Sequence, residues 1–490
     1  MYDFIVIGGG ISGLYIGNYL KNKNKKFLII ENKTRIGGRI KTFKNKDIIY
    51  EAGAYRFTNN HIRLTKLISK LGLNKYISEM KDKKKFFLRD SHTHKKYNTS
   101  YNLNYNNIIK KLSNIDSKIL INNDILTLVS EYYDNETKNF VKDYCGYDNF
   151  IENSNAIQLK QHYKLLNSKF YKLNCGFNKI TEILFNNIKN ETLLGEKLID
   201  IKMSIKNEYQ IITEKNIYKC RKIIITIPKE NLLEIPFISQ NIKYLESVSS
   251  SPYLRIFAVY PKEKGKVWFH DINYTVTDNI LRKIIPENYE TGLIQICYND
   301  NKNAEYMRNI ISNGRLQITL HQNLKKIFPN KNIPEPTFLN YHYWKNGNHF
   351  WLPLYNIKDI QKYMINPINN LYISGESYSE NQAWIEGALE TSDKIINLLE
   401  KKTIKKTIKK QKLYTIEQVS KHNNKRSAWT IVNNKVYNIT SLVNNFKHPG
   451  GNVIENAMGK NITNIFNNIG HSNFSKNLLE KFYIGNIKII

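Results

Sequence analysis

The sequence is poor in cysteine, and it lacks long apolar runs and a leader segment. Its 490 residues include four scattered cysteines, Cys145, Cys175, Cys220 and Cys297. This pattern favours a reducing compartment and argues against a disulfide framework or a zinc site. No run of about 18 apolar residues occurs, so no membrane span is predicted. The first residues, MYDFIVIGGG, have no charged leader region or cleavage site, and they indicate a strand inside the fold rather than a secretion signal.

Acidic residues are also scarce relative to basic ones. The chain has 42 Asp and Glu against 74 Lys and Arg, a formal net charge of +32 and a pI of about 9.6. Such a charge fits an acidic partner, either nucleic acid or an anionic membrane. The alternative is a biased genome composition, since Lys, Asn and Ile are abundant throughout while Arg is rare and not clustered with aromatics. We prefer the alternative, and nucleic acid is not expected as a partner.

The chain is too long for a single hydrophobic core, so several domains are expected. Residues 401–412, KKTIKKTIKKQK, contain no Gly or Pro and carry charges of one sign. They predict either a short exposed helix or a solvated linker. We therefore expect a large domain over 1–400, a basic linker over 401–412 and a small domain over 413–490.

A glycine-rich loop follows the first predicted strand, Asp3–Ile7, and precedes a predicted helix. In such a loop the first glycine allows a tight turn, the second lets the backbone approach a pyrophosphate, and the third lets helix and strand pack closely. The next strand, Phe27–Ile30, ends about 20 residues further on in an acid suited to ribose hydroxyls. We predict dinucleotide binding rather than incidental glycines, with FAD or NAD preferred over NADP. The expected cofactor-binding residues are Gly8, Gly10, Ser12, Gly13 and Glu31.

Later motifs select among the dinucleotides. Arg35-Ile36-Gly37-Gly38-Arg39 resembles the second signature of the flavin amine oxidase superfamily. KIIITIP at Lys222–Pro228, LYISGE at Leu371–Glu376 and AWIEGALE at Ala383–Glu390 resemble its later motifs, in order. The resemblance implies an α/β fold, with an FAD-binding Rossmann-type domain and a mixed-sheet substrate domain. It also implies FAD contacts from Arg39, Gly375 and Glu376. Members that tether their flavin use a Cys near the late Gly-Glu motif, and since no Cys follows Cys297 we expect non-covalent FAD.

Two positions resemble the amino-acid oxidase branch of this superfamily. The segment EAGAYRF contains Arg56 where L-amino-acid oxidases place an Arg that grips the substrate carboxylate. A planar guanidinium suits that role because it binds a carboxylate through two parallel hydrogen bonds. Trp384 and Ile385 also resemble that branch, and Trp384 is expected at the site. The alternative is that Arg56 pairs with an internal acid or with the FAD region.

One position departs from the superfamily. Its members usually carry a Lys near the flavin, and the comparable strand here, YLRIF at Tyr253–Phe257, contains Arg255 instead. An Arg stays charged and cannot act as a base. We count Arg255 among the catalytic candidates and expect altered oxygen reactivity; the alternative is an ordinary strand residue. Four aromatic residues are expected either to wall the pocket or to pack in the core: Tyr343, Trp344, Trp351 and Trp384.

The last segment resembles cytochrome b5, a small α+β domain. It contains His448-Pro449-Gly450-Gly451 and Gly470-His471-Ser472. The resemblance implies a b-type haem with His448 and His471 as its two axial ligands and with Phe466 packed against it. No CxxCH occurs, which excludes a covalent c-type haem. The alternative is a b5-like fold without haem.

Together these patterns predict a FAD-dependent oxidoreductase that acts on a small-molecule amine or L-amino acid and passes electrons to haem b. Hydride transfer from a carbon bearing nitrogen needs orientation and a dry flavin face more than an acid–base pair. An external electron acceptor is left open. The alternatives are a desaturase or protoporphyrinogen-oxidase-like enzyme on an apolar substrate, and a non-catalytic flavin–haem structural component. We expect a cytoplasmic location, or a virion-associated one if the source is a giant virus.

Overall fold

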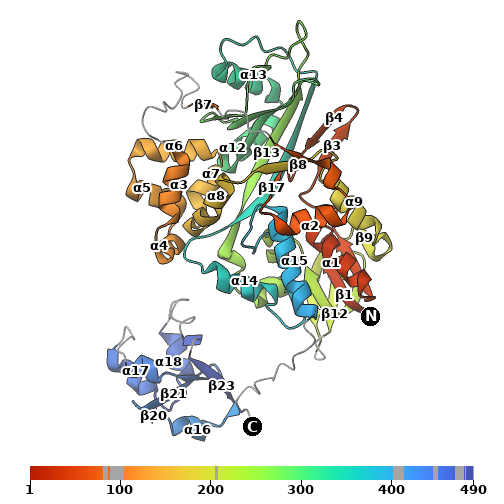
Figure 1. Ribbon diagram of the computed structural model, residues 1–490. Helices are drawn as coiled ribbons and strands as arrows, with labels where there is room; N and C mark the ends of the chain where they lie inside the picture. Colours follow the sequence, from red (N-terminus) through yellow and green to blue (C-terminus); the bar gives the residue numbers. More distant parts are fainter. Residues whose placement is uncertain are drawn as a thin grey trace. The chain divides into compact units, whose positions relative to one another are not determined.

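The computed structural model describes residues 1–80, 86–88, 104–204, 208–400, 413–444, 451–469, 479–480 and 482–488 (Figure 1). The chain divides into two compact units, residues 1–400 and 401–490. The predicted linker, 401–412, lies outside the described residues.

A seven-stranded sheet carries the glycine-rich loop of the first unit. Strands β1, β2, β9, β12 and β18 run parallel and direct their carboxyl ends to one edge, while β11 and β10 extend the sheet antiparallel. The central strands β1 and β12 are apolar and buried toward their carboxyl ends, where both faces of the sheet are covered. The strands are β1 (Tyr2–Ile7), β2 (Phe27–Glu31), β9 (Thr192–Leu194), β10 (Leu198–Met203), β11 (Tyr209–Thr213), β12 (Ile217–Ile225) and β18 (Leu371–Ile373).

Helices cover both faces of this sheet (Figure 1). Successive residues of β1 serve opposite cores, since side chains alternate along a strand: Phe4 and Val6 face one, Ile5 and Ile7 the other. The first core includes residues of α1 (Ile11–Asn22), α2 (Ile62–Lys70), α9 (Asn178–Asn186) and α15 (Ile385–Glu400). The second core includes residues of α10 (Lys229–Leu233), α11 (Pro236–Asn241) and α14 (Ile357–Ile365).

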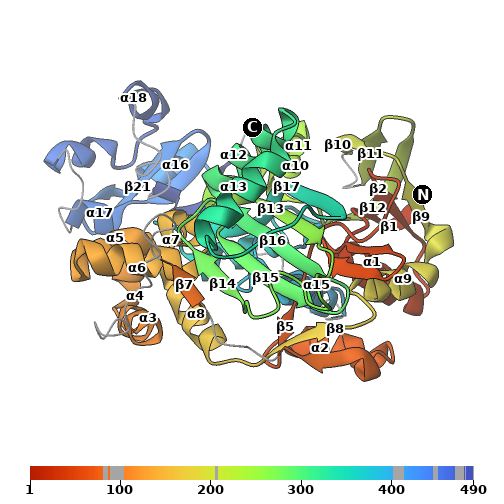
Figure 2. The same ribbon diagram turned by 90° about the horizontal axis from the view of Figure 1, so that it is seen from above.

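A mixed six-stranded sheet forms the second layer of this unit. Its longest pairing is antiparallel, between β13 and β17, and only its last pair, β14 with β7, is parallel. Helix α12 (Asn301–Ser312) packs on β13 and β16, and α13 (Leu316–Ile327) lies beside it (Figure 2). The strands are β7 (Phe86–Leu88), β13 (Val248–Val259), β14 (Thr275–Thr277), β15 (Lys283–Asn288), β16 (Leu293–Asp300) and β17 (Phe338–Trp351).

Short helices within residues 105–166 share a core of their own. Polar side chains begin the first three of them: Asn104, Asp116 and Asp124 each accept a hydrogen bond from the first turn of the helix that follows. The helices are α3 (Tyr105–Ser113), α4 (Ser117–Asn122), α5 (Ile125–Tyr132), α6 (Asn135–Cys145), α7 (Asp148–Asn153) and α8 (Leu159–Leu166). Two small sheets complete the unit: β3 (Thr42–Asn45) with β4 (Ile48–Glu51), and β5 (Phe57–Thr58) with β8 (Phe170–Leu173) and β6 (Ile77–Glu79).

The second unit is a small α+β domain. Its sheet has the order β19-β23-β22-β21-β20, and its core includes Ala428, Tyr437, Ile439 and Ala457. Its elements are β19 (Leu413–Tyr414), α16 (Ile416–Ser420), β20 (Asn423–Asn424), β21 (Ser427–Val432), β22 (Lys435–Asn438), α17 (Thr440–Asn444), the 3-10 helix Gly451–Ala457, α18 (Thr463–Asn468) and β23 (Tyr483–Ile487).

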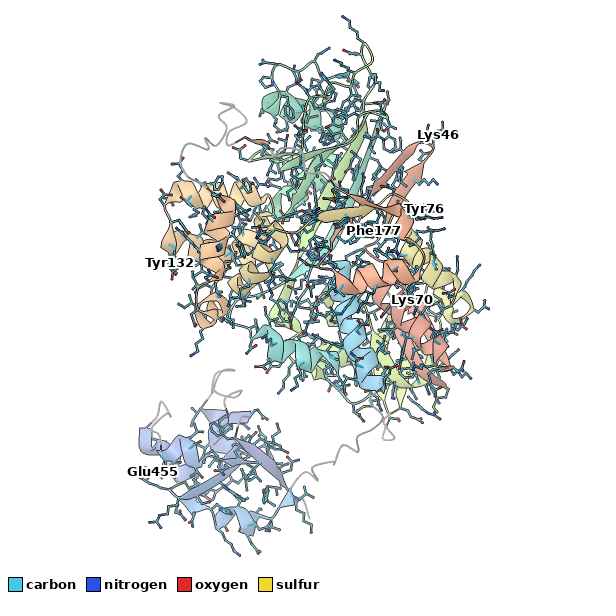
Figure 3. The ribbon with its side chains drawn as sticks, viewed as in Figure 1. Lys46, Lys70, Tyr76, Tyr132, Phe177 and Glu455 are labelled. Carbon is cyan, nitrogen blue, oxygen red and sulfur yellow. The ribbon has the colours of Figure 1, made fainter. Side chains whose placement is uncertain are left out.

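Figure 3 draws the side chains on the ribbon and labels Phe177, Lys46 and Lys70. Phe177 is fully buried, whereas Lys46 and Lys70 are exposed. Within the described ranges, no helix combines the length and apolar character needed to cross a membrane.

Candidate functional site

The parallel strands of the first sheet bring distant motifs to one edge. The loop after β1, residues Thr226–Pro228 after β12 and residues Ser374–Glu376 after β18 all follow carboxyl ends of strands. Thr226 joins two of these segments, because its hydroxyl donates to the carbonyls of Ile7 and Gly8 at 2.9 and 3.1 Å. Ligands of open α/β sheets bind beyond this edge.

The glycines of the first loop meet the expected conformational demands. Gly8 has φ +107°, a left-handed value that favours glycine. A Cβ on Gly13 would lie 2.0 Å from the carbonyl oxygen of Gly8, whereas a Cβ on Gly10 would meet nothing within 4 Å. Gly13 therefore permits close packing of α1 on β1, and Gly10 leaves open space beside the helix N-terminus.

Glu31 and Ser12 lie at the same edge. The Glu31 carboxylate accepts hydrogen bonds from the amides of Gly9 at 2.6 Å and Lys33 at 2.8 Å. It also lines a large cavity that opens beyond this edge of the sheet. Ser12 is buried, and its hydroxyl donates to the carbonyl of Ala388 in α15 at 3.1 Å. Ser12 thus ties α1 to α15 while lining the cavity.

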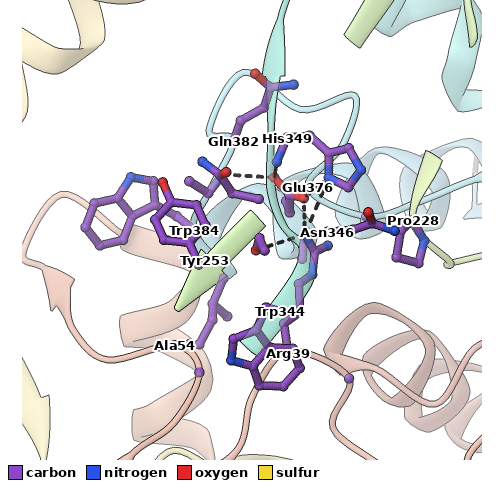
Figure 4. Close-up of a pocket in the computed structure, with 18 of the residues that line it drawn as sticks. Arg39, Ala54, Pro228, Tyr253, Trp344, Asn346, His349, Glu376, Gln382 and Trp384 are labelled. Atoms are coloured by element: carbon purple, nitrogen blue, oxygen red, sulfur yellow. Dashed lines mark hydrogen bonds and ion pairs between the residues drawn. The ribbon is translucent and has the colours of Figure 1, made fainter. Parts of the chain in front are cut away.

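Arg39 and Glu376 form an ion pair at 2.5 Å, and His349 joins them (Figure 4). The two ring nitrogens of His349 face two carboxylates, Nδ1 to Glu376 at 2.5 Å and Nε2 to Glu230 at 3.0 Å. Burial alone would lower the pKa of His349, but these carboxylates raise it. Burial would likewise raise the pKa values of both acids. Arg39 and His349 hold the pKa of Glu376 well below its usual range, and His349 lowers that of Glu230 to about 2.

No sequence motif pointed to His349 or Glu230, because β17 and α10, which contain them, are far apart in the chain. Gly375, by contrast, lies where its motif implies. It has φ +137°, and its amide donates to the hydroxyl of Thr391 at 2.9 Å. A Cβ there would meet nothing within 4 Å, so the backbone after β18 is open to a ligand.

A cavity of about 1320 Å³ runs from the glycine loop to the helices and the second sheet. This volume exceeds the usual 300–1,000 Å³ of a small-molecule site, so it has room for a dinucleotide and a further ligand. We call its two parts the glycine end, lined by Gly8, Gly10, Glu31, Arg39 and Glu376, and the arginine end, lined by Arg56, Tyr147, Arg255, Lys283 and Tyr298.

Arg56 and Arg255 are both at the arginine end. Arg56 follows Tyr55 in the chain, and its guanidinium lies 4.2 Å from the centre of the Phe170 ring. Arg255 is buried on β13, donates to the carbonyl of Glu51 at 2.9 Å and lies 4.3 Å from the ring centre of Tyr298. Neither guanidinium forms an ion pair with a carboxylate among the residues that the structure describes.

Three of the four predicted pocket aromatics line the cavity: Tyr343, Trp344 and Trp384. Trp384 contacts the rings of His61 and Phe170, with centroids 4.7 and 6.5 Å away. Trp351 does not line it; this side chain is fully buried, and its indole N–H donates to the carbonyl of Ser379 at 2.9 Å. The structure thus supports the core-packing alternative for Trp351.

The proposed haem ligands, His448 and His471, lie outside the described residues. Phe466 is described: it is on α18 and packs against the core of the second unit. Val453, Ile465 and Ile469, in the described stretch between the two histidines, are more than 60% exposed. Exposed large apolar side chains at this place fit the apolar face of a haem, which would cover them.

Family comparisons agree with both units. Residues 11–394 match the family described as flavin containing amine oxidoreductase, and residues 415–488 match the cytochrome b5-like heme/steroid binding domain. Among solved structures, a triple mutant of putrescine oxidase aligns with a TM-score of 0.66 and 13% identity, covering 81% of this chain and 98% of that one. Wild-type putrescine oxidase bound to putrescine gives 0.65, with 13% identity and coverage of 81% and 99%. At this identity the likeness shows the fold alone.

Curated relatives match shorter stretches. Cytochrome b5 of Borago officinalis is 42% identical over 77 residues, 16% of this chain and 57% of that protein. Flavin-containing amine oxidase A of Equus caballus is 40% identical over 78 residues, 16% of this chain and 15% of that protein. The chain therefore spans less than two thirds of the length of these relatives.

These matches confirm the predicted α/β flavin fold, the cytochrome b5-like tail and the two cofactors that the domains imply, FAD and b-type haem. The glycine end fits FAD, since it offers an open helix N-terminus, an acid at the end of β2 and an open backbone after β18. Non-covalent attachment stays a prediction. Of the four cysteines, Cys145 lines the cavity, from the end of α6.

Proposed function

Because the chain belongs to the flavin containing amine oxidoreductase family and ends in a cytochrome b5-like domain, we propose that it oxidises an L-amino acid and passes the electrons to its own haem. FAD, when bound, supplies a two-electron acceptor, and haem b a one-electron acceptor. The carbon–nitrogen unit of the substrate loses two electrons and two protons and becomes an imine. An external acceptor must then collect the electrons from the haem one at a time.

The observation that carries the choice of an amino acid over a simple amine is Arg56. Its guanidinium lines the cavity, is stacked on Phe170 and has no carboxylate partner among the described residues. Arg56 is half-buried, and a charge held partly out of water without a partner is costly. A substrate carboxylate would compensate it through two hydrogen bonds. A diamine such as putrescine, which the solved relative binds, would instead bring positive charge to this end.

Other residues that line the cavity position the substrate and exclude water from it, and they do not transfer protons. Arg255 keeps its proton at all working pH values, so it cannot serve as a base. Trp344 and Trp384 supply apolar surface that excludes water from the reacting carbon. The amine must arrive neutral, and orientation by Arg56 supplies the catalytic advantage.

Substitution of Arg56 tests this proposal. We expect Arg56→Met to lower kcat/KM for an L-amino acid. The loss should correspond to about 2–4 kcal/mol of transition-state stabilisation, the scale for removing one partner of a charge-assisted hydrogen-bonded pair. The decarboxylated amine of the same side chain should react poorly with the wild type and change little in the variant. Rates of flavin bleaching under anaerobic conditions measure both.

Arg308→Met is the matched control, because Arg308 also lines the cavity but is exposed and pairs with Glu305 at 3.7 Å. It should leave both rates unchanged. Equal losses on the acid and the amine in Arg56→Met would assign Arg56 to structure or FAD binding. Bleaching by a porphyrinogen or another apolar substrate, but by no amino acid or amine, would overturn the proposal.

A further inference from the structure

The arginine end of the cavity carries more positive charge than one substrate carboxylate requires. Its described lining residues include Arg56, Arg255 and Lys283. The four acids that line the cavity, Glu31, Glu196, Glu234 and Glu376, all belong to the first sheet or its connections. Positive charge is therefore concentrated where the substrate would lie, and negative charge is concentrated toward the cofactor.

Arg255 is the second guanidinium that has no carboxylate partner among the described residues. Only 6% of the residue is exposed, and its guanidinium donates to the backbone carbonyl of Glu51 and contacts Tyr298, so that no carboxylate among the described residues pairs with it. The nearby carboxylates are engaged elsewhere. Glu51 accepts from the amide of Phe177 at 2.9 Å and from the hydroxyl of Thr42, and Glu287 accepts from the hydroxyl of Tyr55 at 3.4 Å. Burial raises the pKa of both acids, so their negative charge is weakened as well.

Arg56 and Arg255 face shared surroundings. Tyr55 precedes Arg56 in the chain, and its ring centre lies 5.5 Å from the Arg255 guanidinium. Arg255 also lies 4.3 Å from the ring centre of Tyr298, which packs against Tyr147 with ring centres 5.7 Å apart. Both tyrosines and both arginines line this end of the cavity, where a small ligand would lie.

We infer that Arg56 and Arg255 bind two anionic groups of one substrate, so that the preferred substrate is an acidic L-amino acid. This inference rests on the proposed function and names the substrate class of the same site. Arg56 binds the carboxylate beside the reacting carbon, and Arg255 binds the side-chain anion. Phenol groups of the surrounding tyrosines donate hydrogen bonds to either anion. A neutral side chain would leave Arg255 buried and uncompensated.

The test compares isosteric substrates on the full-length holoenzyme. L-Glutamate and L-aspartate are set against L-glutamine and L-asparagine, and kcat/KM is measured by anaerobic flavin bleaching. We expect at least one acid to exceed its amide by tenfold or more. Arg255→Met should remove that advantage by lowering the acid-to-amide ratio of kcat/KM at least tenfold. Arg308→Met should preserve it.

Glutarate, a dicarboxylate with no oxidisable carbon–nitrogen bond, gives a readout independent of turnover. Calorimetric titration should show binding to the wild type, weakened at least tenfold by Arg255→Met and separately by Arg56→Met. If Arg255→Met fails to fold, the acid-to-amide ratio and glutarate binding of the wild type still decide. Amides that react as well as acids, or no glutarate binding, would overturn this inference and leave the proposed function intact. Failure of every amino acid and amine to bleach the flavin would overturn both.

Discussion

Glycines in the first loop are required for two different physical reasons. At Gly13 any side chain would strike the carbonyl oxygen of Gly8, so the constraint comes from the protein itself. At Gly10 the surrounding space is open and φ is −76°, a value that any residue adopts. The constraint at Gly10 must therefore come from the cofactor.

This difference predicts opposite behaviour of two alanine variants. Gly13→Ala should destabilise the flavin-free protein by about 1–3 kcal/mol, the usual scale of overpacking. Gly10→Ala should leave the stability of the flavin-free protein unchanged and weaken FAD binding at least tenfold. Thermal unfolding of the apoprotein and titration with FAD separate the two effects. Wild-type FAD affinity in Gly10→Ala would show that the loop does not hold the pyrophosphate.

Glu51 gives the stability of the protein a pH dependence of unusual sign. Burial raises its pKa from the ordinary 4.5 to about 7, against hydrogen bonds from Phe177 and Thr42. The folded state therefore keeps the proton longer than the unfolded state. The contribution of Glu51 is fully present below pH 4.5 and is lost as the pH rises toward 7.

We expect Glu51→Gln to remove this dependence. Relative to the wild type, the variant should gain stability between pH 5 and pH 8, on the order of 2 kcal/mol. Unfolding free energies from urea titrations at both pH values check it. Parallel pH profiles of the two proteins would mean that Glu51 is already ionised at pH 5.

Residues whose role is local could be predicted from the sequence, whereas residues whose role depends on long-range pairing could not. The loop glycines and Glu31 follow from spacing within one strand–helix–strand unit. Arg56 was named through a resembling segment and lines the cavity, and its role stays a prediction. His349 was missed, because nothing near it in sequence indicates that β17 brings it between Glu230 and Glu376. Trp351, expected as a possible pocket wall, belongs to the core because its strand ends there.

At the scale of elements, a buried acid on one helix caps the N-terminus of another. Glu386 in α15 accepts hydrogen bonds from the amides of Arg63 and Leu64, at 3.2 and 3.0 Å, and from the Arg63 guanidinium at 3.1 Å. Both amides belong to the first turn of α2, which lacks acceptors within its own helix. The positive end of the α2 dipole also favours an anion here.

Glu386→Gln should therefore destabilise the first unit by about 1–3 kcal/mol, since one acceptor and the charge are lost in a buried place. Urea unfolding measures the change. Glu400→Gln is the control, because Glu400 ends the same helix but is exposed and pairs with Lys23 at the surface. Equal effects of the two substitutions would show that the cap on α2 is unimportant.

Strands were easier to anticipate than their partners. Apolar runs predicted the positions of β1 and β2, since burial of both faces leaves a continuous hydrophobic signal. The pairing of β14 with β7 had no such signal, because the two strands are short and nearly 190 residues apart in the chain. The starts of α3, α4 and α5 are set by capping side chains, which hydrophobic periodicity does not reveal.

At the scale of the whole molecule, the fusion itself is the main clue to electron flow. A haem held by two histidines has no open position, so it transfers electrons and does not bind oxygen. The twelve residues 401–412, which follow α15 and precede β19 in sequence, would hold the flavin and haem domains at an effective concentration on the mM scale. Arg255, in place of the usual lysine, would also leave reduced flavin available to the haem if reaction with oxygen is slow.

The most direct test of this account is anaerobic stopped-flow mixing of the full-length holoenzyme with an oxidisable amino acid. Flavin absorbance should fall first, and haem reduction should follow at a rate that does not change with protein concentration. His448→Ala and His471→Ala should each abolish the haem phase and leave flavin bleaching intact. Haem that stays oxidised beside fully reduced flavin, or that is reduced at a rate proportional to protein concentration, would contradict transfer within one chain.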